Sequence, residues 1–125
     1  MATITEDYCS YEVAKLLKEK GFNEECFALY NPDGVLIQSG IRLNNIQVGR
    51  VKGSYSAPTQ QMAMRWLREV HNIDICVFPY ESDYIRYSYE VKIYKNKEMY
   101  LSITDSKTYE EAVEAALKYS LEKLI

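Results

Sequence analysis

The stretch from Tyr84 to Ile103 limits the fold more than any other part of the sequence. Its first half alternates between an apolar and a polar set of side chains. The apolar set is Ile85, Tyr87, Tyr89, Val91 and Ile93, and the polar set is Arg86, Ser88, Glu90 and Lys92. This period of two is typical of an antiparallel strand with one buried face. The rest of the chain must therefore supply a layer that covers that face.

A second strand follows after a turn, and its apolar residues also fall on odd-numbered positions, from Met99 to Ile103. Directly paired residues point to the same face, so odd positions should pair with odd positions. A two-residue loop of Asn96 and Lys97 would instead pair odd positions with even ones. We therefore expect a three-residue loop, either 95–97 or 96–98, with Asn96 or Lys97 in the left-handed region.

Three amphipathic helices are predicted, each from a start signal followed by apolar residues at helical spacing. The first follows the N-cap Ser10 and ends at Gly21. The second opens at residues 58–59 and runs to about His71. The third follows Thr108 and extends over about 16 residues. Its single apolar stripe would cover the central hairpin, giving a C-terminal ββα unit.

Shorter strands complete the prediction. A hairpin of residues 25–30 and 35–38 surrounds the turn Asn31-Pro32-Asp33-Gly34, and a further strand spans 73–78. The segment from Ser39 to Ser56 could be a loop or extra strands. We expect an α+β fold with an antiparallel sheet of about five strands and three helices. Their order is α-β-β-(loop or strands)-α-β-β-β-α, in a single domain of residues 1–125.

Composition limits the partners and the compartment. The net charge of −3 gives no global attraction to nucleic acid. The N-terminus lacks the basic and apolar regions of a leader, and no run approaches the ~20 apolar residues of a membrane span. We therefore expect a cytoplasmic protein without a membrane partner. The cysteines, Cys9, Cys26 and Cys76, form no Cys-x-x-Cys pair, so we expect reduced thiols that behave as small apolar residues.

An enzyme would need a set of residues that the sequence does not offer. It has one histidine, no glycine-rich phosphate loop and no paired carboxylates at a recognisable spacing. His71 and Cys76 are the only base and nucleophile near each other, and no neighbouring residue would lower the thiol's pKa. His71 lies at a helix end, where the dipole favours an imidazolium. We expect no enzyme activity, no cofactor, and no catalytic or metal-binding residues.

The sequence contains one internal similarity. Lys15-Leu16-Leu17-Lys18-Glu19 is similar to Arg65-Trp66-Leu67-Arg68-Glu69, and each string precedes a predicted strand. A weak duplication of a helix-strand-strand unit would explain this, although such strings are common on amphipathic helices.

A second similarity lies outside the chain. It rests on Ala57-Pro58-Thr59-Gln60, the string from Arg65 to His71, the tyrosine-rich hairpin and Thr108-Tyr109-Glu110-Glu111-Ala112. With these features the chain resembles small uncharacterised proteins encoded by phages and integrated elements of gut anaerobes. The resemblance spans most of the chain and implies an accessory protein of a mobile element. It implies no activity and no functional residues.

Two function classes remain. The twelve tyrosines favour a non-catalytic accessory or regulatory module that acts through protein contacts or self-association, such as a homodimer. The alternative is nucleic-acid binding, in which tyrosines stack on bases and basic side chains contact phosphates. Both use one candidate surface: Arg42, Arg50, Lys52, Tyr84, Arg86, Lys92, Tyr94 and Tyr100.

Overall fold

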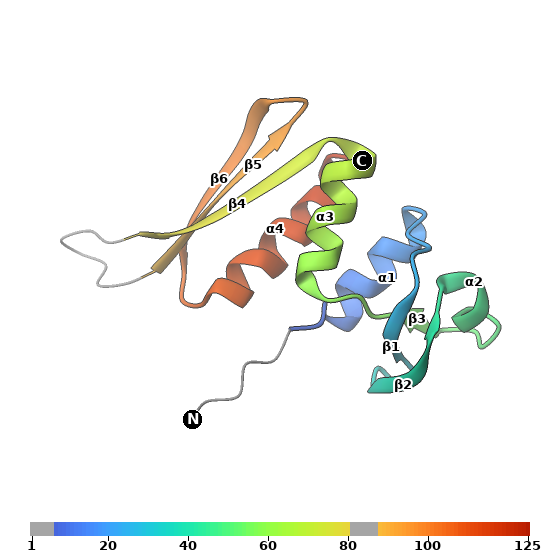
Figure 1. Ribbon diagram of the computed structural model, residues 1–125. Helices are drawn as coiled ribbons and strands as arrows, with labels where there is room; N and C mark the ends of the chain where they lie inside the picture. The colour runs from blue at the N-terminus through green and yellow to red at the C-terminus, as the bar shows by residue number, and fades with distance from the viewer. Residues whose placement is uncertain (1–6, 81–87) are drawn as a thin grey trace. The chain divides into compact units, whose positions relative to one another are not determined.

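The computed structural model describes residues 7–80 and 88–125 and has an α+β fold (Figure 1). These two ranges contain four helices and two three-stranded antiparallel sheets. The prediction of one sheet of about five strands with three helices was therefore wrong in detail. The chain forms two compact units, Met1–Met62 and Ala63–Ile125, which we describe separately as unit 1 and unit 2. The single domain stays a prediction.

Unit 1 contains two helices and the first sheet. Its elements are α1 (Tyr11–Glu19), β1 (Cys26–Tyr30), β2 (Leu36–Leu43), α2 (Asn45–Val48) and β3 (Tyr55–Ser56), and α3 (Gln60–His71) begins at its end. The strand order is β2-β1-β3, so β2 is an outer strand. The segment from Ser39 to Ser56 thus holds the last five residues of β2, a short helix and a two-residue strand.

The ends of α1 follow the predicted signals. The Ser10 hydroxyl accepts a hydrogen bond from the Val13 amide at 3.2 Å. Gly21 has a φ of 95°, and the Phe22 amide donates to the Leu17 carbonyl at 2.9 Å. This backbone bond and the positive φ form the Schellman ending that a glycine at this position allows.

The β1–β2 hairpin is confirmed, and it contains an irregularity. The Gly34 amide donates to the Asn31 carbonyl at 2.9 Å, and Gly34 has a φ of 79°. After this turn, three consecutive residues, Leu36 to Gln38, pair regularly with Tyr30 to Ala28. Leu43 then pairs with Cys26, so residues 39–42 lie opposite Phe27 alone. The regular part of β2 is therefore short and close to the turn.

One face of this sheet is closed by α1. Ala14 of α1 packs with Ala28, Tyr30 and Ala57, and three partly buried tyrosines surround them: Tyr8, Tyr11 and Tyr55. The Tyr30 hydroxyl donates to the Cys9 carbonyl at 2.6 Å. Tyr30 is thus a core residue and the other three tyrosines pack against the core. Tyr30 and Tyr55 are strand residues, in which aromatic side chains are common.

The buried amide of Asn45 fixes α2 within unit 1. Its Nδ2 donates to the Phe22 carbonyl at 2.7 Å, and its Oδ1 accepts from the Ser56 amide at 2.8 Å. Asn44 and Gln47 form a capping box at the start of the same helix. The segment after β2 is thus held by specific hydrogen bonds.

Unit 2 contains the second sheet and two helices. Its elements are most of α3, then β4 (Ile73–Tyr80), β5 (Ser88–Lys95), β6 (Glu98–Ser106) and α4 (Tyr109–Lys123). The strand order β4-β5-β6 places the alternating strand at the centre. In unit 1 the first strand after the helix is central, whereas here the second one is. In both units a helix precedes two paired antiparallel strands, but the order of the later elements differs, and the third strand lies beside β1 in unit 1 and beside β5 in unit 2.

The second predicted helix starts slightly later than expected. Thr59 acts at its N-terminus, because its hydroxyl accepts from the Met62 amide at 3.2 Å, so Pro58 precedes the helix. Of its apolar residues at helical spacing, Trp66 and Leu67 are buried, whereas Val70 is 56% exposed. Asn72 ends the helix with a φ of 55°.

The β5–β6 hairpin reaches the predicted pairing for Leu101 and Ile103, but not for Met99, and it does so by an unexpected route. The loop has two residues, Asn96 and Lys97, with φ values of 51° and 69°, so the three-residue prediction was wrong. The parity is corrected next to the loop, because Tyr94 pairs with Met99 whereas Ile93 pairs with Leu101. The extra residue is Tyr100, a bulge that returns the following odd positions to odd partners.

The apolar face of this sheet is covered by α4, which packs against all three strands (Figure 1). Val91 and Ile93 of β5 and Leu117 and Leu121 of α4 are fully buried. The predicted ββα packing is confirmed for these residues. The remaining positions of the predicted alternation, Tyr84, Ile85, Arg86 and Tyr87, lie outside the described residues. No helix in the two described ranges is long and apolar enough to cross a membrane.

Candidate functional site

The sheet of unit 1 has an apolar face that α1 does not cover. In β1, Cys26, Ala28 and Tyr30 are buried, so the alternate residues Phe27 and Leu29 point to the opposite face. Ile37 pairs with Leu29 and shares that face, as does Val35 two residues earlier. Phe27, Val35 and Ile37 are 50%, 55% and 42% exposed. We call these four residues, Phe27, Leu29, Val35 and Ile37, the outer apolar face.

The outer strand β2 adds a second exposed feature. Four of its eight side chains are apolar, Arg42 is its only charged residue, and it contains no lysine or proline. Natural outer strands usually carry such residues, because an unprotected strand edge pairs readily with another chain. On β2, only the irregularity at residues 39–42 interrupts the edge.

A hollow lies where β1 begins, beside Arg42. It has a volume of about 320 Å³, and its lining residues are Tyr8, Glu25, Cys26, Phe27, Arg42, Ala57, Pro58, Thr59 and Met62. The Arg42 guanidinium lies over the Phe27 ring at 5.1 Å. Burial raises the pKa of the Cys26 thiol to about 11, and the negative charge of Glu24 makes a smaller contribution in the same direction. This thiol is therefore unreactive at neutral pH. The hollow suits a side chain or a small ligand with apolar and polar parts.

The residues predicted from the sequence to form one surface fall into two sets. Arg42, Arg50 and Lys52 belong to unit 1, where all three are exposed. The other described residues, Lys92, Tyr94 and Tyr100, belong to unit 2. Tyr84 and Arg86 lie outside the described residues. Only Arg42 borders the outer apolar face.

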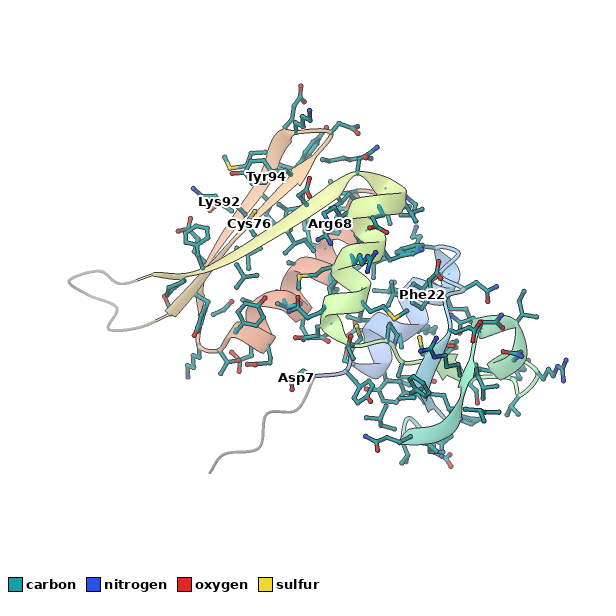
Figure 2. The ribbon with its side chains drawn as sticks, viewed as in Figure 1. Asp7, Phe22, Arg68, Cys76, Lys92 and Tyr94 are labelled. Atoms are coloured by element: carbon teal, nitrogen blue, oxygen red, sulfur yellow. The ribbon has the colours of Figure 1, made fainter. Side chains whose placement is uncertain are left out.

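In unit 2, Lys92 and Tyr94 lie on the sheet face opposite α4, together with Cys76 (Figure 2). Acidic side chains share this face. Asp74 pairs with Tyr94, and Glu90 accepts a hydrogen bond from the Ser102 hydroxyl at 3.0 Å. Lys92 is held over the Phe78 ring at 5.4 Å. With two carboxylates beside one ammonium group, these side chains form no basic patch.

The histidine and the cysteines differ in their surroundings. The His71 ring packs edge-on against the Trp66 ring, with 4.7 Å between the ring centroids. Burial lowers the pKa of His71, and the positive charge of Lys95 makes a smaller contribution in the same direction. The expected stabilisation of an imidazolium by the helix dipole is therefore outweighed by desolvation. Cys9 and Cys26 are buried, but Cys76 is exposed, so the expectation that all three behave as small apolar residues does not hold for Cys76. No cluster of metal-binding side chains occurs within residues 7–80 and 88–125.

The outer apolar face was missed in the sequence, although a signal exists. Val35, Leu36 and Ile37 are consecutive apolar residues, so a strand containing them must be apolar on both faces. The sequence predicts only one helix near them, the one that follows Ser10. A strand that is apolar on both faces, but covered by a helix on one of them, leaves its other apolar face exposed.

Comparisons with protein-family models, with curated proteins and with solved structures gave no match to this chain.

Proposed function

We propose that this chain is a non-catalytic accessory or regulatory module that acts through protein–protein contacts, with the outer apolar face and the β2 edge as its contact surface. The exposure of Phe27, Val35 and Ile37 on one sheet face carries the proposal. Contiguous apolar residues of this kind mark interaction sites in soluble proteins. Covering them gains about 25 cal/mol for each Å² of apolar surface removed from water.

The strand edge supports a specific mode of contact. An extended segment of a partner can add to β2 through main-chain hydrogen bonds, while its side chains rest on the outer apolar face. The hollow beside Arg42 and Phe27 would then receive one side chain of the partner. Backbone pairing supplies affinity, and the hollow supplies selectivity.

The tyrosine content supports the proposal less than the sequence suggested, because Tyr11, Tyr30 and Tyr55 belong to the core of unit 1. The resemblance to proteins of phages and integrated elements supports the assignment to a mobile element.

Capture from a cell lysate of the encoding organism tests the proposal. The wild-type chain is compared with the double variant Ile37→Ser and Ile41→Ser, and with a control, Val70→Ser and Met99→Ser. The control also removes two exposed apolar side chains, but from unit 2. We expect a protein retained by the wild type and the control and lost from the β2 variant. Equal capture by all three folded proteins would refute this use of the surface.

Nucleic-acid binding is the alternative, favoured by Lys92 and Tyr94 on the same face of β5. The carboxylates of Asp74 and Glu90 on that face oppose it, because phosphates would be repelled. Anisotropy of a fluorescent oligonucleotide at low ionic strength decides the matter. The absence of a salt-dependent change would exclude the alternative.

A further inference from the structure

We infer that a second copy of this chain pairs with β2, antiparallel across its free edge and centred on Ile37. The inference rests on the proposed function, since it names the partner of the same strand edge. It begins from the hydrogen-bonding direction of the residues in β2, which decides where another strand can add.

Among the described residues no strand pairs with the outer side of β2, and the regular part of β2 offers paired donors and acceptors there. The Asn31 amide donates to the Val35 carbonyl at 3.1 Å, and the Val35 amide donates to the Asn31 Oδ1 at 2.9 Å, so these two residues occupy a hydrogen-bonded position of the ladder. In an antiparallel ladder such pairs alternate, which makes Leu29 and Ile37 the next one. The amides and carbonyls of Leu36 and Gln38 therefore point to the free edge.

A two-fold axis through Ile37 satisfies these groups. It places Leu36 of one copy opposite Gln38 of the other, so each exchanges an amide and a carbonyl hydrogen bond with its partner. The two Ile37 residues then form a non-hydrogen-bonded pair, the kind in which side chains approach most closely. Both Ile37 side chains lie on the outer apolar face, which becomes continuous over the two copies.

The charges on β2 and on the turn before it are also compatible with pairing to a second copy. The strand is neutral except for Arg42, so its antiparallel copy brings no like charges together at the centre. Pairing around Ile37 brings Arg42 of one copy beside the Asn31–Gly34 turn of the other. Asp33 is the only charged residue of that turn, and it is exposed. A parallel arrangement would instead place the two Arg42 side chains together.

Sedimentation equilibrium and a cysteine variant test the inference. We expect the wild-type chain to dimerise reversibly with concentration, and Ile37→Lys to remain monomeric because two ammonium groups would meet at the axis. Ile46→Lys adds the same charge at a residue of α2 that is 70% exposed, and it should dimerise like the wild type. Circular dichroism verifies that both variants are folded.

The second measurement does not rely on an added charge to break the dimer. In a Cys76→Ser background, Ile37→Cys should oxidise to a disulfide-linked dimer, because the expected Cα separation suits a disulfide. Ile46→Cys should not. A wild-type monomer at every concentration, or a dimer that persists in folded Ile37→Lys, would overturn the inference. If the chain is monomeric but lysate capture still requires Ile37 and Ile41, the proposed function stands and only the second copy is excluded.

Discussion

Replacing Leu117 by alanine tests the packing of unit 2. Leu117 lies in the middle of α4, is fully buried and faces the sheet. The substitution removes three carbon atoms, which corresponds to about 2.4 kcal/mol of transfer free energy at ~0.8 kcal/mol per buried methylene. The cavity left behind adds to this, so we expect a loss of about 2–5 kcal/mol in the free energy of unfolding. This is a large part of the roughly 5–15 kcal/mol of a typical domain.

Urea unfolding, monitored by tryptophan fluorescence, measures the loss in the free energy of unfolding in unit 2, where Leu117 lies. Trp66 is the only tryptophan in the sequence, and it is buried in the part of α3 that belongs to unit 2. With a slope of ~2 kcal/mol per molar urea, the midpoint should fall by about 1–2.5 M. Glu122→Ala, at an exposed position of the same helix, should change stability by less than about 0.5 kcal/mol. Similar midpoints for the two variants would refute the docking of α4 on this sheet.

Three further predictions concern single groups. Asn45→Ala removes the partner of the Phe22 carbonyl and the Ser56 amide, so we expect a loss of about 1–3 kcal/mol in circular dichroism melts, against little change for Ile46→Ala. Because folding lowers the pKa of His71, its stabilising contribution is complete above its unfolded pKa of about 6.5 and is lost as the pH falls through the lowered value. The stability of His71→Gln should therefore decline less than that of the wild type between pH 7 and 5 in urea titrations, and an equal decline would contradict the shift. Iodoacetamide at pH 8 should modify Cys76 rapidly and spare Cys9 and Cys26, so mass spectrometry of Cys76→Ser should show no fast-reacting thiol.

Local signals predicted much of this fold. Ser10, Gly21 and Thr108 act through bonds to residues three or four positions away, so the sequence around them contains all the information about these helix ends. The alternation from Tyr89 to Ile93 likewise predicts its own buried face. The capping box at Asn44 and Gln47 is also local, but it precedes a helix of four residues, which is too short for a periodic pattern.

Features that depend on distant partners were not predictable in this way. The separation of the strands into two sheets depends on which strands meet in space, not on the pattern within each strand. The bulge at Tyr100 allows a two-residue loop and the correct parity together, an arrangement that alternation alone does not select. To predict the outer apolar face, one would have to know that α1 covers only one side of β1 and β2.

Photo-crosslinking inside cells of the encoding organism tests the proposed contact surface most directly. A benzoylphenylalanine residue replaces Ile37 on β2 in one variant and Val70 on α3 in another, since both positions are exposed apolar sites. The proposed function predicts a discrete crosslinked product from position 37, either a dimer of this chain or a complex with another protein, and little product from position 70. No product at position 37, or the same products from both positions, would contradict a contact surface on β2.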